Sequence, residues 1–416
     1  MAAARAVAIV RAMSRPIASA ETQGAVALPQ GFAAGAVHCG LRKDPTHADL
    51  ALLLADRARP AAAIFTQNRL VGAHVHLCRD HLRRSNGLVR AIVVNARNAN
   101  CATGEQGIAD ARAVCGALSQ RIGCPPEQVL MASTGPIGAP LPKDKILARL
   151  DALLQSASPQ GAAAFARAIM TTDTVPKART ATLPCDGGEA RATGFAKGAG
   201  MIHPDMATML AFTVADAAPG RADARALELL LRRVADRSFH RVTIDGDTSP
   251  NDTWILWAGG RTADAAAFER AVTTVAQDLA RLIAADGEGM TRLITVEVRG
   301  ALDEAEAARV GRTIATSPLV KTAVAGRDPN WGRILSAAGR AGVPFDAERA
   351  RVWVGPAEVY RHGVPHPERE GEAHRHLVEQ REIVLGVDLA RGTAAADIWT
   401  CDLTKDYVQI NADYRS

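Results

Sequence analysis

The residues best suited to carry out a reaction lie near the middle of the chain, where a glycine-containing loop meets an apolar run. Residues 197–207 contain a lysine, two glycines and a proline, which are typical of a loop whose backbone approaches a ligand closely. Residues 209–214 follow as Met-Leu-Ala-Phe-Thr-Val, an apolar run with the length of a buried strand. Thr208 therefore places a small hydroxyl at the mouth of a buried element, where it could act as a nucleophile. Taken alone, most threonines in such a position are ordinary loop or strand residues.

Four other segments are rich in the small and polar residues that line ligand-binding turns. Residues 95–104 follow an expected strand, residues 131–138 are expected to form a turn, and residues 171–174 carry three hydroxyl groups. Residues 244–252 carry three aspartates and an asparagine, but glycine and glutamate do not stand where a calcium loop needs them. Each segment is weak evidence alone, because side chains of these types also cap local backbone groups.

No metal, cofactor or disulfide framework is indicated by the sequence. The seven cysteines are widely scattered and contain no C-x-x-C pair, a pattern typical of a reduced, intracellular protein. Four histidines lie within residues 361–376 among proline, glycine and glutamate, and we interpret this insert as a solvated loop rather than a metal site. No G-x-G-x-x-G follows an expected strand, and neither a P-loop nor a G-x-S-x-G motif is present. The usual markers of dinucleotide, nucleotide and α/β-hydrolase chemistry are therefore missing.

Length and composition describe a soluble globular protein. A chain of 416 residues suggests two or three domains or lobes, and 48% apolar with 22% charged residues is ordinary for this class. The net charge of +5 comes without a dense basic patch, which argues against a nucleic-acid binder, and no apolar segment is long enough for a membrane span. We interpret residues 1–23 as a disordered tail on a cytoplasmic protein. The alternative is an organellar targeting segment over residues 1–20, which carry three arginines and no acid.

Mixed strands and helices are expected in both halves of the chain, without βαβ regularity. Strands are expected around residues 62–66, 91–95, 209–214, 253–257, 292–298, 352, 383–387 and 398–401, with a polar, strand-like segment at the C-terminal end. Helices are expected around residues 108–122, 143–154, 227–234, 264–283 and 304–315. We therefore expect an α/β (α+β) protein, a layered sandwich of mixed sheets and helices in two lobes, with a site built from polar turns.

The central stretch and the polar turns together resemble a known family. Residues 197–210, Lys-Gly-Ala-Gly-Met-Ile-His-Pro-Asp-Met-Ala-Thr-Met-Leu, closely resemble the self-processing motif of the ornithine acetyltransferases of arginine biosynthesis, also called glutamate N-acetyltransferases. Other blocks resemble those of the family in the same order, at residues 94–100, 133–135, 170–174, 245–252, 286–289, 327–333 and 410–416. The resemblance covers the chain from about residue 24 to its C-terminal end. None of the departures removes a group that the reaction needs; they stand at Arg97, Pro250, Met290 and Arg292.

The resemblance implies that Thr208 acts twice. Its hydroxyl would first attack the Ala207 carbonyl, which would split the protein into an α chain over residues 24–207, preceded by the tail, and a β chain over residues 208–416. Cleavage would give Thr208 a free α-amino group with a pKa of roughly 8, close enough to its own hydroxyl to act as general base without a catalytic triad. Thr208 would then accept the acetyl group of N2-acetylornithine as an ester and pass it to glutamate, in a ping-pong transfer.

The resemblance also implies roles for residues outside the central stretch. Thr134 and the backbone amide of Gly135 would bind the oxyanion of the tetrahedral intermediates. Glu288 would meet the side-chain ammonium of ornithine. The full set of expected substrate contacts is Thr171, Lys197, Thr208, Glu288, Asn411 and Ser416. No metal or prosthetic group is implied, acetyl-CoA remains open as a second acetyl donor, and two pairs of cleaved chains would assemble into an α2β2 heterotetramer.

Two other functions stay open. A self-processing amidase or aminopeptidase with an N-terminal threonine would also cleave between Ala207 and Thr208, but it would release the acyl group to water. A binding protein without activity on the same scaffold would leave that bond intact. Neither nucleic acid nor a membrane is expected as a partner.

Overall fold

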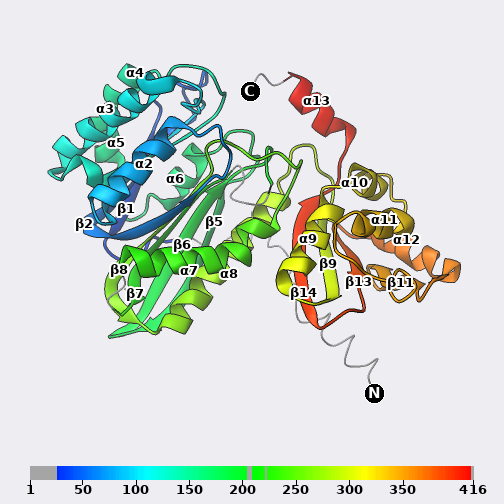
Figure 1. Cartoon of the computed structure of the whole chain (residues 1–416). Helices are drawn as coiled ribbons and strands as arrows, with labels where there is room; N and C mark the ends of the chain where they lie inside the picture. The colour runs from blue at the N-terminus through cyan, green and yellow to red at the C-terminus, as the bar shows by residue number, and fades with distance from the viewer. Residues whose placement is uncertain (1–25, 204–208, 221–222, 414–416) are drawn as a thin grey trace.

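The computed structural model describes residues 26–203, 209–220 and 223–413, and these residues fold around two β-sheets (Figure 1). The first sheet is built from strands between residues 32 and 263, and the second from strands between residues 293 and 401. Helices pack against both sheets, and Figure 1 shows two lobes side by side. The predicted layered α/β architecture with two lobes is confirmed. The predicted tail at residues 1–23 lies outside the described residues.

Eight strands build the first sheet, and its long second strand belongs to two halves of that sheet. The first half of β2 pairs with β1 and β3, its second half pairs with β8, and the register with β3 is irregular between Leu54 and Arg59. β4 continues one half, parallel to β3, while β7 and β6 continue the other half next to β8. The strands are β1 (Phe32–Val37), β2 (Leu50–Phe65), β3 (Leu88–Ala96), β4 (Val129–Thr134), β5 (Lys177–Cys185), β6 (Gly188–Lys197), β7 (Leu210–Pro219) and β8 (Thr253–Ala263).

An aromatic core joins the two halves of the first sheet. Phe32 of β1 lies edge-on to Trp257 of β8, with ring centroids 5.1 Å apart. Phe165 packs edge-on against Phe195 of β6 and Phe212 of β7 in the same buried cluster. Edge-to-face pairs add about 0.5–1.5 kcal/mol each beyond the area that they bury. This core holds the ends of β3, β4, β6 and β7 in fixed positions relative to one another.

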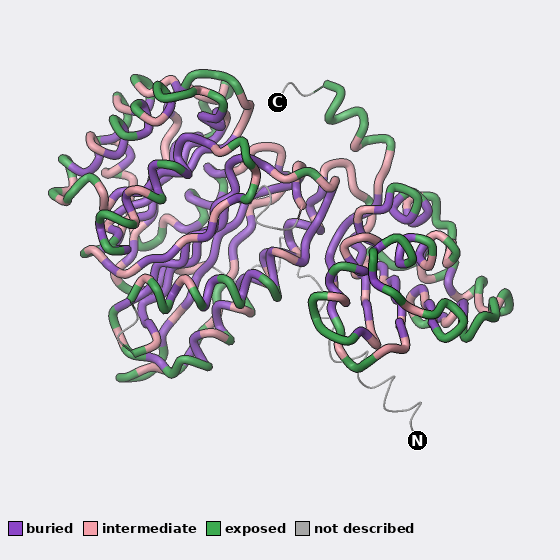
Figure 2. Tube along the Cα trace, viewed as in Figure 1, coloured by how far each residue is buried: buried purple, intermediate pink, exposed green. Residues whose placement is uncertain are grey.

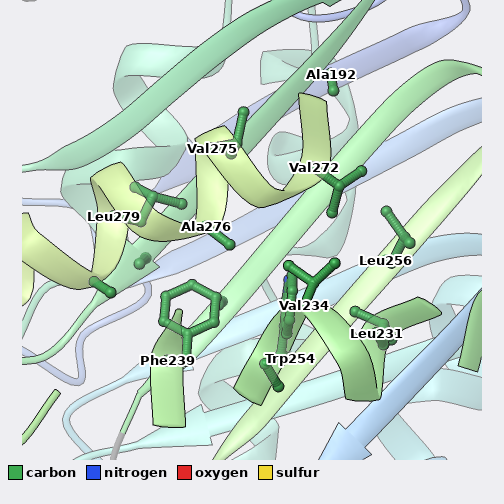
Figure 3. Packing of buried hydrophobic residues seen from close by; sticks show 14 of the residues in the cluster. Ala192, Leu231, Val234, Phe239, Trp254, Leu256, Val272, Val275, Ala276 and Leu279 are labelled. Carbon is green, nitrogen blue, oxygen red and sulfur yellow. The ribbon is translucent and has the colours of Figure 1, made fainter. Parts of the chain in front are cut away.

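Helices cover the outer faces of this sheet. On one side, α2 (Ala73–Arg84) and α3 (Gly104–Ile122) pack against β4, and α4 (Lys143–Leu147) packs against α3. Two more helices, α5 (Leu150–Ser156) and α6 (Ala162–Ala168), lie against β1. On the other side, α8 (Ala265–Ala284) covers β5, β6 and β7, and α7 (Ala224–Asp236) packs beside it against β2. Figure 3 shows Val272 of α8 and Val234 of α7 packed around Trp254. The Asp264 side chain accepts a hydrogen bond from Ala267 N, which fixes the start of α8 where the sequence predicts it.

The second sheet has the strand order β12-β11-β10-β13-β9-β14. Its strands are β9 (Leu293–Ala301), β10 (Arg351–Val354), β11 (Ala357–Arg361), β12 (Val364–Pro365), β13 (Glu382–Asp388) and β14 (Ala394–Cys401). A separate apolar core lies between this sheet and its helices, which are α9 (Glu304–Ala315), α10 (Pro318–Ala325), α11 (Trp331–Gly339) and α12 (Glu370–Glu379). Trp399 and Cys401 of β14 belong instead to the core beneath α8, so the two lobes share apolar contacts.

Two local predictions are wrong at the level of element boundaries. The helix predicted over residues 143–154 is broken between α4 and α5, where Arg149 leaves the helix before Leu150 starts the next one. Residues 131–134, predicted as part of a turn, are the buried end of β4, and the turn begins only at Gly135. Small residues there fit a strand because β4 is buried on both faces.

Two further segments predicted to be non-helical are helices. The histidine-containing insert, predicted as a solvated loop, ends in α12, because Ala373 and Leu377 lie four residues apart and bury one helical face. The polar C-terminal segment, predicted to be strand-like, is helix α13 (Lys405–Asp413). Figure 2 shows α13 as exposed along most of its length, and none of its residues is buried, so no buried apolar face accompanies this helix.

Candidate active site

One cavity brings together six of the residues to which the family resemblance assigns a role. These residues are Thr134, Gly135, Thr171, Lys197, Glu288 and Asn411. The cavity is also lined by Ala99, Ile137, Thr172, Gly200, Met201, Ser249, Pro250 and Asn251. The other three assigned residues, Ala207, Thr208 and Ser416, lie outside the described residues.

The cavity lies at the edge of the first sheet where β6 ends and β7 begins. Lys197, the last residue of β6, is the strand partner of Leu210, the first residue of β7. Met209 is buried, and its carbonyl accepts a hydrogen bond from Thr253 N at 3.0 Å. The residue that directly follows Thr208 is therefore held in place by both burial and a backbone hydrogen bond, next to a strand end that lines the cavity.

Thr134 and Gly135 lie at the carboxyl end of β4, beside the parallel end of β3. Asn98 N donates to Thr134 O at 3.0 Å, which ties the end of β4 to the loop after β3. Gly135 has a φ of +141°, and a Cβ atom placed on it would lie 2.4 Å from Asn98 N and from the carbonyl carbon of Arg97. Only glycine fits this close approach of two backbone segments.

Lys197 is a buried ammonium aimed at Thr134. Its Nζ donates to Thr134 Oγ1 at 3.2 Å, and the residue is 4% exposed. Burial lowers the pKa of Lys197 below its ordinary value, and Lys177 adds to this effect. Asp173, Asp252 and Glu288 oppose it, because each negative charge favours the ammonium form.

The contact with Lys197 also determines what Thr134 can do. An ammonium group has only hydrogen-bond donors, so Thr134 Oγ1 must accept in this contact. The hydroxyl hydrogen of Thr134 is then left to point at another acceptor. A hydroxyl oriented in this way can donate to a negatively charged oxygen in the cavity.

A cluster of buried charges lies behind Lys197. Asp173 accepts from Lys177 Nζ at 2.7 Å, from Gly198 N at 2.6 Å and from Thr171 N at 3.0 Å. Lys177 also donates to Asp286. Burial raises the pKa of Asp173, but Lys177 and Lys197 outweigh burial and hold it well below its usual range. Burial lowers the pKa of Lys177, but Asp173 and Asp286 outweigh it and raise the value above normal.

Glu288 enters the cavity from the turn that follows α8. Its backbone nitrogen donates to Ala199 O at 2.8 Å, which joins this turn to the glycine-containing loop. A Cβ atom on Gly200 would lie 2.5 Å from the Glu288 carboxylate, so a larger residue there would make this side chain move. Asn411 Nδ2 of α13 donates to Glu288 Oε2 at 2.8 Å. Glu288 thus provides a carboxylate on the wall formed by the loop and α13.

Helix α13 is attached to the site through polar contacts. Thr404 Oγ1 donates to Gly289 O at 2.6 Å, and Tyr407 donates through its hydroxyl to Asp245 Oδ2 at 3.2 Å. Asp245 also accepts from the backbone nitrogens of Met201 and Ile202 at 2.6 and 3.0 Å. Burial raises the pKa of Asp245. One carboxylate therefore connects the glycine-containing loop with the C-terminal helix.

Several residues that shape the cavity were not singled out in the sequence. Asn251 Nδ2 donates to Ala99 O at 2.6 Å and to Ser133 O at 2.7 Å, which holds the loop after β3 against the end of β4. Asp173 and Asp245 organise the glycine-containing loop, as described above. All three stand inside the polar blocks that carry the family resemblance. Composition alone could not separate these positioning roles from local capping.

The cavity combines charges of both signs with hydrogen-bond donors. Lys197 supplies a buried positive charge, Glu288 supplies a negative one, and Thr134 with Gly135 supplies hydrogen-bond donors. Within the described residues, no group of three histidine, cysteine, aspartate or glutamate side chains is placed to hold a metal ion. None of the described helices is both long and apolar enough to cross a membrane.

Comparison with known proteins identifies the family. The ArgJ family matches residues 33–416. The arginine biosynthesis bifunctional protein ArgJ of Thermus thermophilus is 47% identical over 94% of this chain and 99% of its own length, and that of Parasynechococcus marenigrum is 44% identical over 94% and 95%. A solved structure of the Bacillus halodurans protein of the same name is 38% identical, covers 49% of this chain and 98% of its own, and has a TM-score of 0.46. The chain therefore belongs to the ArgJ family of arginine-biosynthetic acetyltransferases.

Proposed function

We propose that this acetyltransferase moves the acetyl group of N2-acetylornithine to glutamate through an acetyl ester on Thr208, after it has cleaved its own chain between Ala207 and Thr208. One observation carries the proposal. Lys197, Thr134, Gly135 and Glu288 converge on one cavity at the sheet edge where β7 starts, two residues after Thr208. The relatives from Thermus thermophilus and Parasynechococcus marenigrum are named as arginine biosynthesis proteins, which agrees with these substrates.

In the first half-reaction, Thr208 Oγ attacks the acetyl carbonyl of N2-acetylornithine. The free α-amine of Thr208, with a pKa of roughly 8, takes the hydroxyl proton and later passes a proton to the departing amine of ornithine. Thr134 Oγ1 and Gly135 N donate to the oxyanion, and each such donor is worth about 3–4 kcal/mol. The orientation that Lys197 imposes on the Thr134 hydroxyl supports this role. In the second half-reaction, the amine of glutamate attacks the acetyl ester and regenerates Thr208.

Binding of the amino acids uses the charges of the cavity. Lys197 and Thr171 bind the α-carboxylate that both substrates share, because a buried ammonium without solvent around it attracts a carboxylate strongly. Glu288 binds the side-chain ammonium of ornithine. Asn411 and Ser416 of the C-terminal segment contribute further contacts. Acetyl-CoA is a second candidate donor for the same acetyl-threonine.

Cleavage would leave two chains that remain interlocked. β6 and β7 pair along their length, from Ala192 opposite Ala215 to Lys197 opposite Leu210. The proposed α chain (24–207) and β chain (208–416) therefore share one sheet. β2 and β8 add a second antiparallel pairing between them. Separation of the chains would expose both strand edges and the aromatic core. We propose that two such αβ pairs form an α2β2 heterotetramer.

Intact mass spectrometry beside an acetyl-transfer assay tests the proposal. Wild type is expected as two chains cut at Ala207–Thr208, and Thr208→Ala as one full-length chain. With acetyl-labelled N-acetylornithine and glutamate, the label is expected in N-acetylglutamate, and a parallel reaction with acetyl-CoA alone decides whether it is a donor. A wild-type chain that stays intact after prolonged incubation would overturn the proposal. Release of the label as free acetate would favour an amidase instead.

A further inference from the structure

Three buried side chains, Asp173, Lys177 and Asp286, form an ion cluster behind the wall of the cavity. Lys177 Nζ bridges the two carboxylates, at 2.7 Å from Asp173 Oδ1 and in a close contact with Asp286 Oδ2. The side chains of Lys177 and Asp173 are 0% exposed, and that of Asp286 is 5% exposed. None of the three side chains lines the cavity itself. Any effect of the cluster on a substrate must therefore pass through the segments that it holds.

Asp173 holds two of these segments. Its carboxylate accepts from Thr171 N at 3.0 Å and from Gly198 N at 2.6 Å. Thr171 itself lines the cavity, and Gly198 directly follows Lys197. A single carboxylate thus fixes the backbone of one proposed substrate contact and of the residue next to another.

Asp286 holds the third segment. It accepts from Thr174 through both the backbone nitrogen and the hydroxyl, and it lies two residues before Glu288 in the turn after α8. Lys177 therefore links the segment that carries Glu288 with the segments that carry Thr171 and Lys197. The link also crosses the proposed cleavage site, since residues 24–207 supply Asp173 and Lys177 while residues 208–416 supply Asp286.

Stability alone is a weak reason for such a cluster. The cost of removing charges from water offsets much of their attraction, so buried ion pairs are often no more stabilising than apolar groups of the same shape. The cluster does, however, define geometry: each carboxylate oxygen is committed to a particular backbone nitrogen or side chain. A defined geometry is what a site for two small charged substrates requires.

We propose that Asp173, Lys177 and Asp286 are positioning residues that set the spacing between the Lys197–Thr171 wall and the Glu288 wall of the cavity, and so control binding of the amino-acid substrates. The inference rests on the proposed function for the identity of those substrates. The cluster acts on Lys197 in a second way, since burial lowers the pKa of Lys197 and Asp173 is the leading charge that opposes this lowering. The other charged groups facing Lys197 are Lys177, Asp252 and Glu288.

The chain contains a matched control for Asp173. Asp216 is also buried, and it also accepts from two backbone nitrogens, those of Arg191 at 2.8 Å and Gln30 at 3.3 Å, and from one cation, Arg261 Nη2 at 2.7 Å. It lies six residues along β7 from Leu210, which corresponds to about 20 Å of strand. Asp173→Asn and Asp216→Asn therefore remove the same charge from similar surroundings, near the cavity and far from it.

The experiment compares wild type, Asp173→Asn, Asp173→Glu and Asp216→Asn in steady-state acetyl transfer and in hydrogen exchange. Asp173→Asn is expected to raise the KM for both amino acids about tenfold or more, with a smaller change in kcat, and to move the alkaline limb of kcat/KM to lower pH. Asp173→Glu keeps the charge and is expected to show a smaller rise in KM with the alkaline limb near that of wild type. Asp216→Asn is expected to keep KM within about twofold of the wild-type value and the alkaline limb at the wild-type pH. This holds even if the variant melts at a lower temperature.

Hydrogen exchange separates this inference from the proposed function. Peptides covering residues 170–174 and 197–202 are expected to exchange faster in Asp173→Asn than in wild type, and no faster in Asp216→Asn. Faster exchange in a protein whose wild type transfers no acetyl group would contradict the proposed function and leave the positioning role in place. Unchanged exchange with unchanged KM, or the same kinetic change in Asp216→Asn, would overturn the positioning role. If Asp173→Asn yields no folded protein, Asp173→Glu serves as the test instead. A KM and a hydrogen-exchange rate equal to those of wild type in Asp173→Glu would then count against the inference.

Discussion

Lys197 Nζ lies 3.2 Å from Thr134 Oγ1, although the two residues are 63 positions apart and belong to different halves of the first sheet. The contact joins the end of β6 to the end of β4 across the cavity. Because the ammonium can only donate, it leaves the Thr134 hydroxyl to donate elsewhere. A buried positive charge and an oriented hydroxyl are thereby combined on one wall of the cavity.

Replacing Lys197 by methionine removes the charge while keeping much of the side-chain volume. We expect kcat/KM for acetyl transfer to fall at least about 100-fold, which corresponds to about 2.7 kcal/mol of lost transition-state stabilisation. Initial rates of N-acetylglutamate formation measure the effect. Lys145→Met is the control, because Lys145 is an exposed lysine on α4. Equal rates in the two variants would show that Lys197 takes no part in the reaction.

The same lysine predicts the alkaline limb of the pH profile. Burial keeps the pKa of Lys197 below its ordinary value, and its proposed role in binding a carboxylate needs the protonated form, so kcat/KM should fall as pH rises through that lowered pKa. The fall is expected below a pH of roughly 10.4, the value for a free lysine. Lys197→Arg keeps a charge that does not titrate in this range and should move the falling limb to higher pH. An alkaline limb that is identical in both proteins would mean that another group causes it.

Gly135 is expected to tolerate no side chain. Alanine there would place a Cβ atom 2.4 Å from Asn98 N, at a φ of +141°. We expect a loss of about 3 kcal/mol or more in the free energy of unfolding, in the range of severe overpacking, together with loss of acetyl transfer. Gly138→Ala is the control, because Gly138 has a φ of +86° but no atom within 4 Å of the added Cβ, so only about 1 kcal/mol of backbone strain applies. Thermal and urea denaturation would show whether the two variants differ as expected.

Asn251 is expected to matter for stability and for the shape of the site. Asn251→Ala leaves the carbonyls of Ala99 and Ser133 without their partner, and a buried polar group that loses its hydrogen bond costs about 1–3 kcal/mol. The variant should therefore unfold at lower urea concentration and transfer acetyl more slowly. Asn330→Ala is the control, because it removes the side chain that caps the start of α11. It should lower the free energy of unfolding by about 1 kcal/mol without slowing acetyl transfer. Normal transfer rates in folded Asn251→Ala would show that the cavity keeps its shape without this amide.

Much of the fold could be predicted from local signals. Asp264 marks the start of α8 because its side chain caps the helix, and β7 is revealed by an apolar run that is buried on both faces. Helix α13 was missed because it has no buried residue, and its Tyr407 and Asn411 contacts depend on loops far away in the sequence. Local propensity cannot indicate a helix that is held by contacts of this kind.

The candidate site depended on the family resemblance more than on the residues alone. Spacing drew attention to Thr208 and to the polar turns, but not to the acyl group or to the amino acids. The ion cluster could not be predicted, because Lys177 and Asp286 are 109 residues apart and nothing in the sequence indicates that their side chains meet. Thr208 itself lies outside the described residues, so its role stays a prediction.

Glu288 should distinguish the two half-reactions. Its carboxylate is proposed to bind the side-chain ammonium of ornithine, a group that glutamate lacks. In a ping-pong reaction kcat/KM for each substrate reports only its own half-reaction, so Glu288→Gln should lower kcat/KM for N2-acetylornithine about 10- to 100-fold, the loss expected for a charge-assisted hydrogen bond. The value for glutamate should change by less than about threefold, since its half-reaction starts from the acetyl-threonine already formed. Glu379→Gln, an exposed change at the end of α12, is the control for charge alone. An equal loss for both substrates would show instead that Glu288 supports the common machinery, through Gly200 and Asn411, and does not select the donor.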